Sequence, residues 1–130
     1  MAIENNLKIA IIGVYFGQLP EYFHLWKKSF ECNKDIDFFL FTDQVISCPS
    51  ENIKVINYSL RKMKERADEV LEIDCALTTP YKCCDFKPVY GLLFSEYLKE
   101  YDYWGHCDCD LIFGDIQTVL QKLMNENWDK

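Results

Sequence analysis

Short apolar, β-branched runs alternate along this chain with segments whose apolar residues recur at helical spacing, and this alternation constrains the fold most. The first run, 7–14, is typical of a strand buried on both faces of a parallel sheet. Further strands are predicted at 36–41, at 53–56 and, shorter, at 102–107. Strands that alternate with helices favour parallel βαβ connections. The predicted fold is therefore α/β, with a mainly parallel sheet flanked by helices.

Four helices are predicted between and after these strands. Pro20 suits a first helical turn, and aromatic residues recur at helical spacing over 20–31. Ser59 can cap a second helix, Pro88 predicts the start of a third, and 72–86 is predicted to be loop. The inner faces are predicted to consist of Leu60, Met63, Ala67 and Val70 in the second helix, and of Ile116, Val119, Leu120 and Leu123 in the last.

The size and charge of the chain limit its class. A length of 130 residues fits one domain, 1–130, and 49% hydrophobic with 15% aromatic residues is enough for a core. A net charge of −7 repels phosphate backbones, so nucleic acid is not an expected partner. No apolar stretch approaches the roughly 20 residues of a membrane span, and the N-terminus has no signal-peptide pattern. We therefore expect a cytoplasmic protein.

The seven cysteines are odd in number and form no CxxC pair. Thiols stay reduced in the cytosol, and the spacing does not match the usual zinc motifs. We therefore expect reduced cysteines that are mostly small core residues. They are Cys32, Cys48, Cys75, Cys83, Cys84, Cys107 and Cys109.

Asp108-Cys109-Asp110 is the sharpest chemical motif. Two carboxylates one residue apart, at the end of an apolar strand, can hold one hard cation such as Mg²⁺ or Mn²⁺ together with substrate phosphates. Such a metal neutralises the charge that develops on a departing diphosphate. The alternative is a pair of solvated turn acids. Apolar residues on both sides favour the metal hypothesis, because a polar pair between buried runs needs partners.

Other polar and aromatic residues follow the predicted strands, and in a parallel sheet such ends converge on the ligand site. Tyr15 or Phe16 can stack on a base, and Gly17 allows close approach of a ligand. Asp43 can accept a hydrogen bond from a base or ribose. The alternatives are core packing for Phe16 and a turn-forming role for Asp43.

Asp85-Phe86-Lys87-Pro88 is a second candidate for phosphate binding. If a helix begins at Pro88, Lys87 lies near its N-terminus, where anions are favoured, and Lys82 is close in sequence. The alternative is that Asp85 only caps the helix. His24 and His106 are interpreted as structural.

Taken in order, Tyr15-Phe16-Gly17, Phe41-Thr42-Asp43, Asp85-Phe86-Lys87-Pro88 and, most specifically, the stretch 104–115 resemble a family of bacterial glycosyltransferase-like proteins of polysaccharide and lipopolysaccharide assembly. The resemblance implies a Rossmann-like GT-A fold, a nucleoside diphosphate sugar donor and Mn²⁺ or Mg²⁺. It assigns metal binding to Asp108 and Asp110, and places Tyr15 and Asp43 in the nucleotide pocket. The implied acceptor is a glycan or lipid-linked glycan.

The sequence departs from GT-A enzymes after the acidic motif, where those enzymes continue into an acceptor-binding half. The expectation is a donor-binding domain cut before that half, which transfers no sugar alone and self-associates through its uncovered surface. Two alternatives remain: a non-catalytic fragment or interaction module with the same fold, and a metal-dependent phosphohydrolase that uses the same acidic pair.

Overall fold

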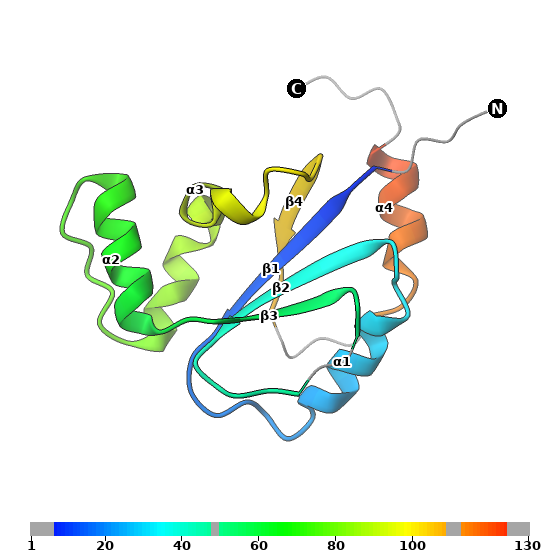
Figure 1. Cartoon of the computed structure of the whole chain (residues 1–130), viewed down its shortest axis with the longest axis horizontal. Coiled ribbons are helices and arrows are strands. Elements are labelled where there is room, and N and C mark those ends of the chain that lie inside the picture. Colours follow the sequence, from blue (N-terminus) through cyan, green and yellow to red (C-terminus); the bar gives the residue numbers. More distant parts are fainter. Residues whose placement is uncertain (1–6, 48–49, 109–112, 125–130) are drawn as a thin grey trace.

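The computed structural model describes residues 7–47, 50–108 and 113–124, which form an α/β fold around a parallel sheet (Figure 1). The strands are β1 Ile9–Tyr15, β2 Ile36–Thr42, β3 Ile53–Asn57 and β4 Tyr103–His106, and their order in the sheet is β3-β2-β1-β4. Residues Ile9 to Tyr15 of β1 pair with Ile36 to Thr42 of β2, while Ile9 to Ile12 pair with Tyr103 to His106 of β4. The predicted fold class is thereby confirmed.

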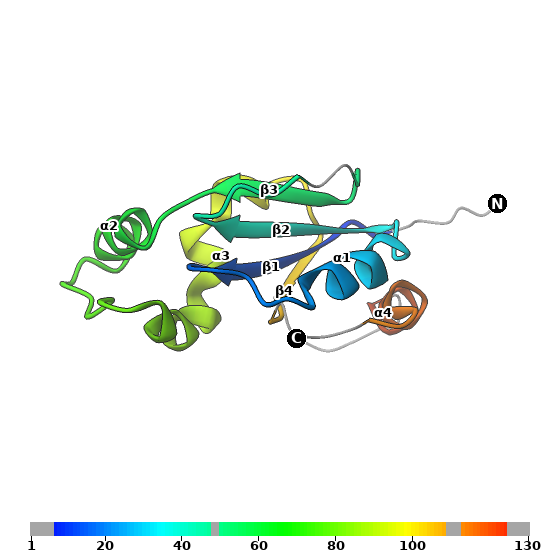
Figure 2. The same ribbon diagram turned by 90° about the horizontal axis from the view of Figure 1, so that it is seen from below.

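Helices cover both faces of the sheet (Figures 1 and 2). Successive side chains of a strand point to opposite faces. Accordingly, Ile9 and Ile11 belong to one apolar cluster, and Ala10 and Ile12 belong to another. The first cluster packs under α1 (Phe23–Glu31) and α4 (Ile116–Met124), and the second under α2 (Leu60–Leu71), the 3₁₀ helix η1 (Pro80–Val89), α3 (Tyr90–Leu93) and the 3₁₀ turn η2 (Ser95–Tyr97).

The cluster under α1 is built from aromatic rings. Trp26 and Phe30 are buried and lie edge-on to Phe38 of β2, with ring centroids 4.6 Å and 5.1 Å away. Gly13 of β1 makes room for Phe38, because a Cβ at position 13 would lie 2.6 Å from Cζ of that ring. The glycine therefore allows one strand's aromatic side chain to lie across the next strand.

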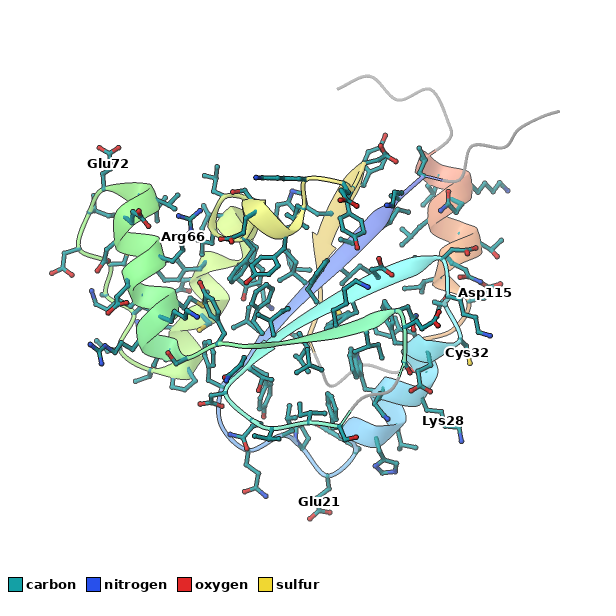
Figure 3. The ribbon with its side chains drawn as sticks, viewed as in Figure 1. Glu21, Lys28, Cys32, Arg66, Glu72 and Asp115 are labelled. Atoms are coloured by element: carbon teal, nitrogen blue, oxygen red, sulfur yellow. The ribbon has the colours of Figure 1, made fainter. Side chains whose placement is uncertain are left out.

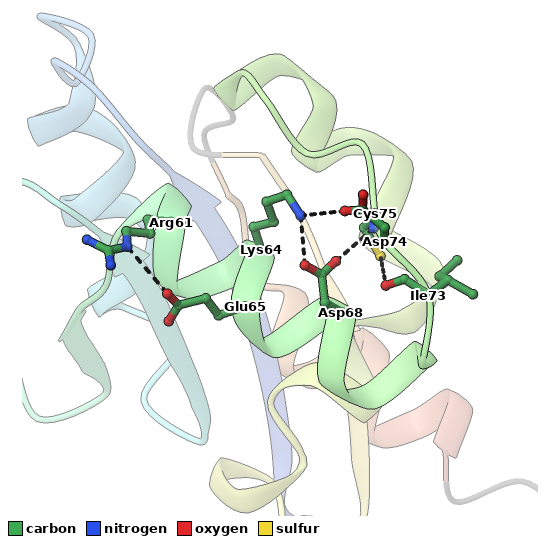
Figure 4. A network of polar contacts seen from close by, with 7 residues as sticks. All are labelled: Arg61, Lys64, Glu65, Asp68, Ile73, Asp74 and Cys75. Carbon is green, nitrogen blue, oxygen red and sulfur yellow. Dashed lines mark hydrogen bonds and ion pairs between the residues drawn. The ribbon is translucent and has the colours of Figure 1, made fainter.

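Helix α2 has well-defined ends. Ser59 caps it as predicted, since the Ser59 hydroxyl accepts a hydrogen bond from the Lys62 N–H at 3.0 Å. From the middle of the helix, Lys64 bridges Asp68 in α2 and Asp74 in the loop that follows, at 2.7 Å and 2.9 Å (Figure 4). Asp68 also accepts from the backbone N–H of Cys75 at 2.7 Å, and the bond from Lys64, followed by this one, lowers the pKa of Asp68. These contacts hold the loop after α2 against the helix.

Contacts between helices fix the layer that covers the second cluster. Arg66 of α2 points toward α3, where its Nε donates to the Leu93 carbonyl at 3.0 Å (Figure 3). Among the helices in the described ranges, none combines the length and apolar character that crossing a membrane requires.

The segment before β4 differs from the prediction. Pro88 does not begin a helix: it lies inside η1, and the following α-helix is the single turn α3. The true start signal is Pro80, which lies at the beginning of η1, so part of the predicted loop 72–86 is helical. Lys87 consequently lies in the last turn of η1 rather than near a helix N-terminus, and Asp85 does not cap a helix.

The inner face predicted for the last helix is half right. Ile116 and Leu120 of α4 pack against the cluster under α1. Val119 and Leu123 are instead 55% and 40% exposed. The side of α4 that faces the fold also carries Gln117 and Gln121, whose side chains hydrogen-bond with the backbone of Asp35 and Leu7, so the helix is rotated relative to the prediction.

Candidate functional site

The carboxyl ends of the parallel strands define one edge of the sheet, and open α/β sheets bind their ligands at this edge. Figure 2 shows β1, β2 and β3 pointing toward the side on which α2 lies. Tyr15 at the end of β1 pairs with Thr42, and Thr42 pairs with Asn57 of β3. The last residue of β4, His106, pairs with Ile12. The loops that follow these residues carry most of the site predicted from the sequence.

Gly17 and Asp43 are brought together at this edge. The Gly17 N–H donates to Oδ1 of Asp43 at 2.9 Å, and Nε2 of Gln44 donates to the same oxygen at 3.0 Å. Gly17 has φ +99°, a conformation that favours glycine. The hydrogen bond from Gly17, followed by that from Gln44, lowers the pKa of Asp43. Asp43 is therefore an exposed carboxylate with a fixed orientation.

The two aromatic residues before Gly17 lie in different surroundings. Phe16 is only 7% exposed and packs in the cluster under α2 and α3, as the core-packing alternative proposes. Tyr15 is half-buried and packs on the opposite face of the sheet. Tyr15 is thus the more accessible of the two for contact with a base.

Lys87 and Asp108 form the second pair at this edge. The ammonium of Lys87 donates to Oδ1 of Asp108 at 2.8 Å, and the two side chains are 25% and 58% exposed. The sequence indicated each residue separately but not their contact. The other members of the acidic motif, Cys109 and Asp110, lie outside the described residues.

Residues 87–91, which precede β4, contact every second residue from Trp104 to Asp108. These contacts place Lys87 beside Asp108. A Cβ on Gly91 would lie 2.7 Å from the ring of Trp104, so only glycine allows this approach. The rings of Tyr90 and His106 meet edge-on at 6.1 Å.

Three contacts thus join residues 87–91 to β4 and the residues just after it: Gly91 with Trp104, Tyr90 with His106, and Lys87 with Asp108. His106 is exposed and its ring contacts Tyr90, so its structural role stays a prediction. The role of Gly91 was missed, although a glycine inside a predicted helix is itself a sign of close packing.

Lys82 and Asp85 are both exposed on η1. The Lys82 backbone N–H donates to the Thr79 carbonyl at 3.0 Å, which is a contact within the 3₁₀ helix. Within the described part of the chain, no hydrogen bond or ion pair joins Lys82 or Asp85 to Asp43 or Asp108.

A surface pocket occurs elsewhere, at the amino edge of the sheet. It is lined by Glu31, Lys34, Ser50, Glu51 and Asn52, none of which was a candidate from the sequence. The pocket has both acidic and basic walls and lies at the edge opposite the strand ends, so it is separate from the site described above.

Asp108 suits a Mg²⁺ or Mn²⁺ ion that is held jointly with a phosphate. Within the described ranges no group of three His, Cys, Asp or Glu side chains gathers to form a cation site made by the protein alone. Mg²⁺ usually binds one or two carboxylates and takes its remaining ligands from substrate phosphates and water. One exposed carboxylate beside a lysine fits that manner of binding.

Comparison with known proteins gives a family but no activity. A family model described as a family of unknown function (DUF6625) matches residues 11–130. No curated protein matches the chain. No solved structure matches it either. Because the family match spans nearly all of the chain, including both residue pairs at the carboxyl edge, the protein belongs to the DUF6625 family of unknown function.

Proposed function

We propose that this chain is the donor-binding domain of a glycosyltransferase. In this proposal it binds a nucleoside diphosphate sugar with Mn²⁺ or Mg²⁺, for transfer of the sugar to a glycan or lipid-linked glycan in polysaccharide assembly. The observation that carries the proposal is the partly exposed Lys87–Asp108 pair at the carboxyl edge of a parallel sheet. A lysine and an acidic metal ligand side by side are the two groups that a diphosphate–metal complex requires.

The two halves of the edge would have different tasks. Asp43, held by the Gly17 N–H, would accept hydrogen bonds from the ribose or base, and Tyr15 would contact the base. Asp108, with Asp110, would hold the metal, and Lys87 would contact the phosphates. The metal would stabilise negative charge on the departing diphosphate. The protein's net charge of −7 repels an anionic ligand. Specific residues at the carboxyl edge would therefore be needed to hold and orient the donor.

The proposal also places the protein in the cytoplasm. Its support is the odd number of cysteines without a CxxC pair, which suits a compartment where thiols stay reduced.

Calorimetry with uridine and guanosine diphosphates, in Mn²⁺ and in chelator, tests the proposal. We expect binding with Mn²⁺, little or none in chelator, and a loss of at least tenfold in affinity in Asp108→Asn. Asp35→Asn is the matched control, because it removes the same charge from an exposed position just before β2, at the other edge of the sheet. Equal affinity in Mn²⁺ and in chelator would rule out a metal-bridged donor.

A further inference from the structure

The lysine at the candidate site already neutralises the carboxylate that a metal would need. Lys87 Nζ lies 2.8 Å from Asp108 Oδ1, which is hydrogen-bonding distance between fully charged groups. The lysine is the more buried partner, with 25% of its side chain exposed against 58% for the aspartate. The neighbouring contacts of Tyr90 with His106 and of Gly91 with Trp104 hold its backbone beside β4.

We infer that Lys87 is a built-in counterion that occupies the cation position at Asp108 until a divalent metal displaces it, and that it then contacts the diphosphate. This inference rests on the proposed function and adds a regulation of the same site. The protein alone would bind free metal weakly. Metal and nucleotide would bind together, since the arriving phosphate gives the displaced ammonium a new partner.

Electrostatics makes the two cations compete. A divalent ion about 2.1 Å from Asp108 Oδ1, with the ammonium still 2.8 Å from the same oxygen, puts the two positive charges at most about 5 Å apart. Like charges this close repel. The lysine must therefore leave that oxygen when a metal binds, and breaking a partly exposed ion pair weakens metal binding roughly two- to fivefold.

The same lysine should have the opposite effect on nucleotide binding. Once displaced, its ammonium remains close to the strand ends because its backbone is packed against β4. Lysine binds phosphate as a point charge. Removal of Lys87 should therefore strengthen the binding of metal alone and weaken the binding of diphosphate with metal. A lysine with a purely structural role would lower both.

The experiment measures the binding of Mn²⁺ alone, and then of uridine diphosphate at saturating Mn²⁺, to the wild type and to Lys87→Met, Lys87→Gln and Lys87→Arg. We expect Met and Gln to bind Mn²⁺ alone two- to fivefold more tightly and the diphosphate at least fivefold more weakly. Arg keeps the charge and should stay near the wild type in Mn²⁺ binding. Lys28→Met is the control, because Lys28 is an exposed lysine on α1 that points away from the sheet (Figure 3).

The outcomes separate this inference from the proposed function. If Lys87→Met and Lys87→Gln, with melting temperatures near that of the wild type, bind Mn²⁺ no more tightly while diphosphate binding still needs the metal, the counterion role is wrong and the donor site stands. An equal gain in Lys28→Met also overturns it, because the effect would then be one of net charge. If no variant binds Mn²⁺ or metal-dependent diphosphate, both the function and the inference fail.

Discussion

At the scale of single residues, Gly17 shows how a backbone conformation can serve a site. Its φ of +99° turns the chain after β1 so that its N–H reaches Asp43. An added Cβ would meet no atom within 4 Å, so the cost of a side chain there comes from the backbone alone. Position 17 therefore separates conformational strain from packing.

We expect Gly17→Ala to lower the free energy of unfolding by about 1 kcal/mol, because alanine adopts this conformation with strain. It should also weaken nucleotide binding, since the loop that orients Asp43 is displaced. Gly114→Ala is the control, because a Cβ there also meets no atom and the residue has no positive φ. Urea denaturation measures both variants, and equal stability would show that the loop tolerates the strain.

Asp43 should make stability depend on pH. Its pKa is lowered in the folded protein, chiefly by the Gly17 N–H, below the ordinary value of 3.8. The stabilisation from its ionised form is therefore complete above about pH 3.8 and is lost as the pH falls through the folded-state pKa. The difference in melting temperature between wild type and Asp43→Asn should shrink below pH 4. A difference that stays constant from pH 6 to pH 3 would contradict this role.

At the scale of elements, β4 and the segment from η1 to α3 act as one unit. Trp104 and His106 of β4 and Asp108, two residues after the strand, each contact a residue between 87 and 91. The packing of Trp104 on Gly91 anchors this segment, while the ion pair at the other end is exposed. Packing therefore positions the ion pair, and a change at Gly91 should be felt at Asp108.

We expect Gly91→Ala to lower the free energy of unfolding by about 1–3 kcal/mol, because its Cβ would lie 2.7 Å from the indole ring. Diphosphate binding should weaken as Lys87 moves away from Asp108. Gly105→Ala in β4 is matched, since a Cβ there meets no atom within 4 Å. Chemical denaturation and calorimetry report both effects; if the two variants behave alike, the anchoring role of Gly91 is wrong.

The strands could be predicted from the sequence because their signal is local: an apolar run such as 36–41 is buried on both faces wherever the strand lies in a parallel sheet. The helix expected at Pro88 could not, because a proline fits both the first turn of an α-helix and a 3₁₀ segment, and tertiary contacts decide between them. The Lys87–Asp108 contact depends on that geometry. It was beyond sequence reasoning, whereas the meeting of Gly17 with Asp43 follows from neighbouring parallel strands.

At the scale of the whole molecule, buried amides hold together the edge opposite the site. Nδ2 of Asn52 donates to the carbonyls of Phe30, Asn33 and Ile36. Asn33 in turn donates to the Gly114 carbonyl at 2.9 Å and accepts from the Gln117 N–H at 3.0 Å. These bonds join α1, β2, β3 and α4. The amino edge thus carries stability, and the carboxyl edge carries the candidate site.

We expect Asn52→Asp to lower the free energy of unfolding by about 3 kcal/mol or more, because a carboxylate would face three carbonyl oxygens without a donor. Folded protein should still bind diphosphate with unchanged affinity, since the change lies at the other edge. Asn57→Asp, at the exposed end of β3, is the control and should alter stability by less than about 0.5 kcal/mol. Similar losses in the two variants would show that the amide network does not carry this stability.

The central position of β1 has a consequence for synthesis on the ribosome. β1 is the first strand of the chain, yet one of its two neighbours is β4. Lys8 and Asp102, which meet beside that pairing, are 94 residues apart in sequence. At typical translation rates, roughly 5 to 20 seconds separate the synthesis of the two. During that time β1 presents an unpaired apolar edge of the kind that recruits other strands. We therefore expect the nascent chain to depend on chaperones until β4 emerges and pairs with β1.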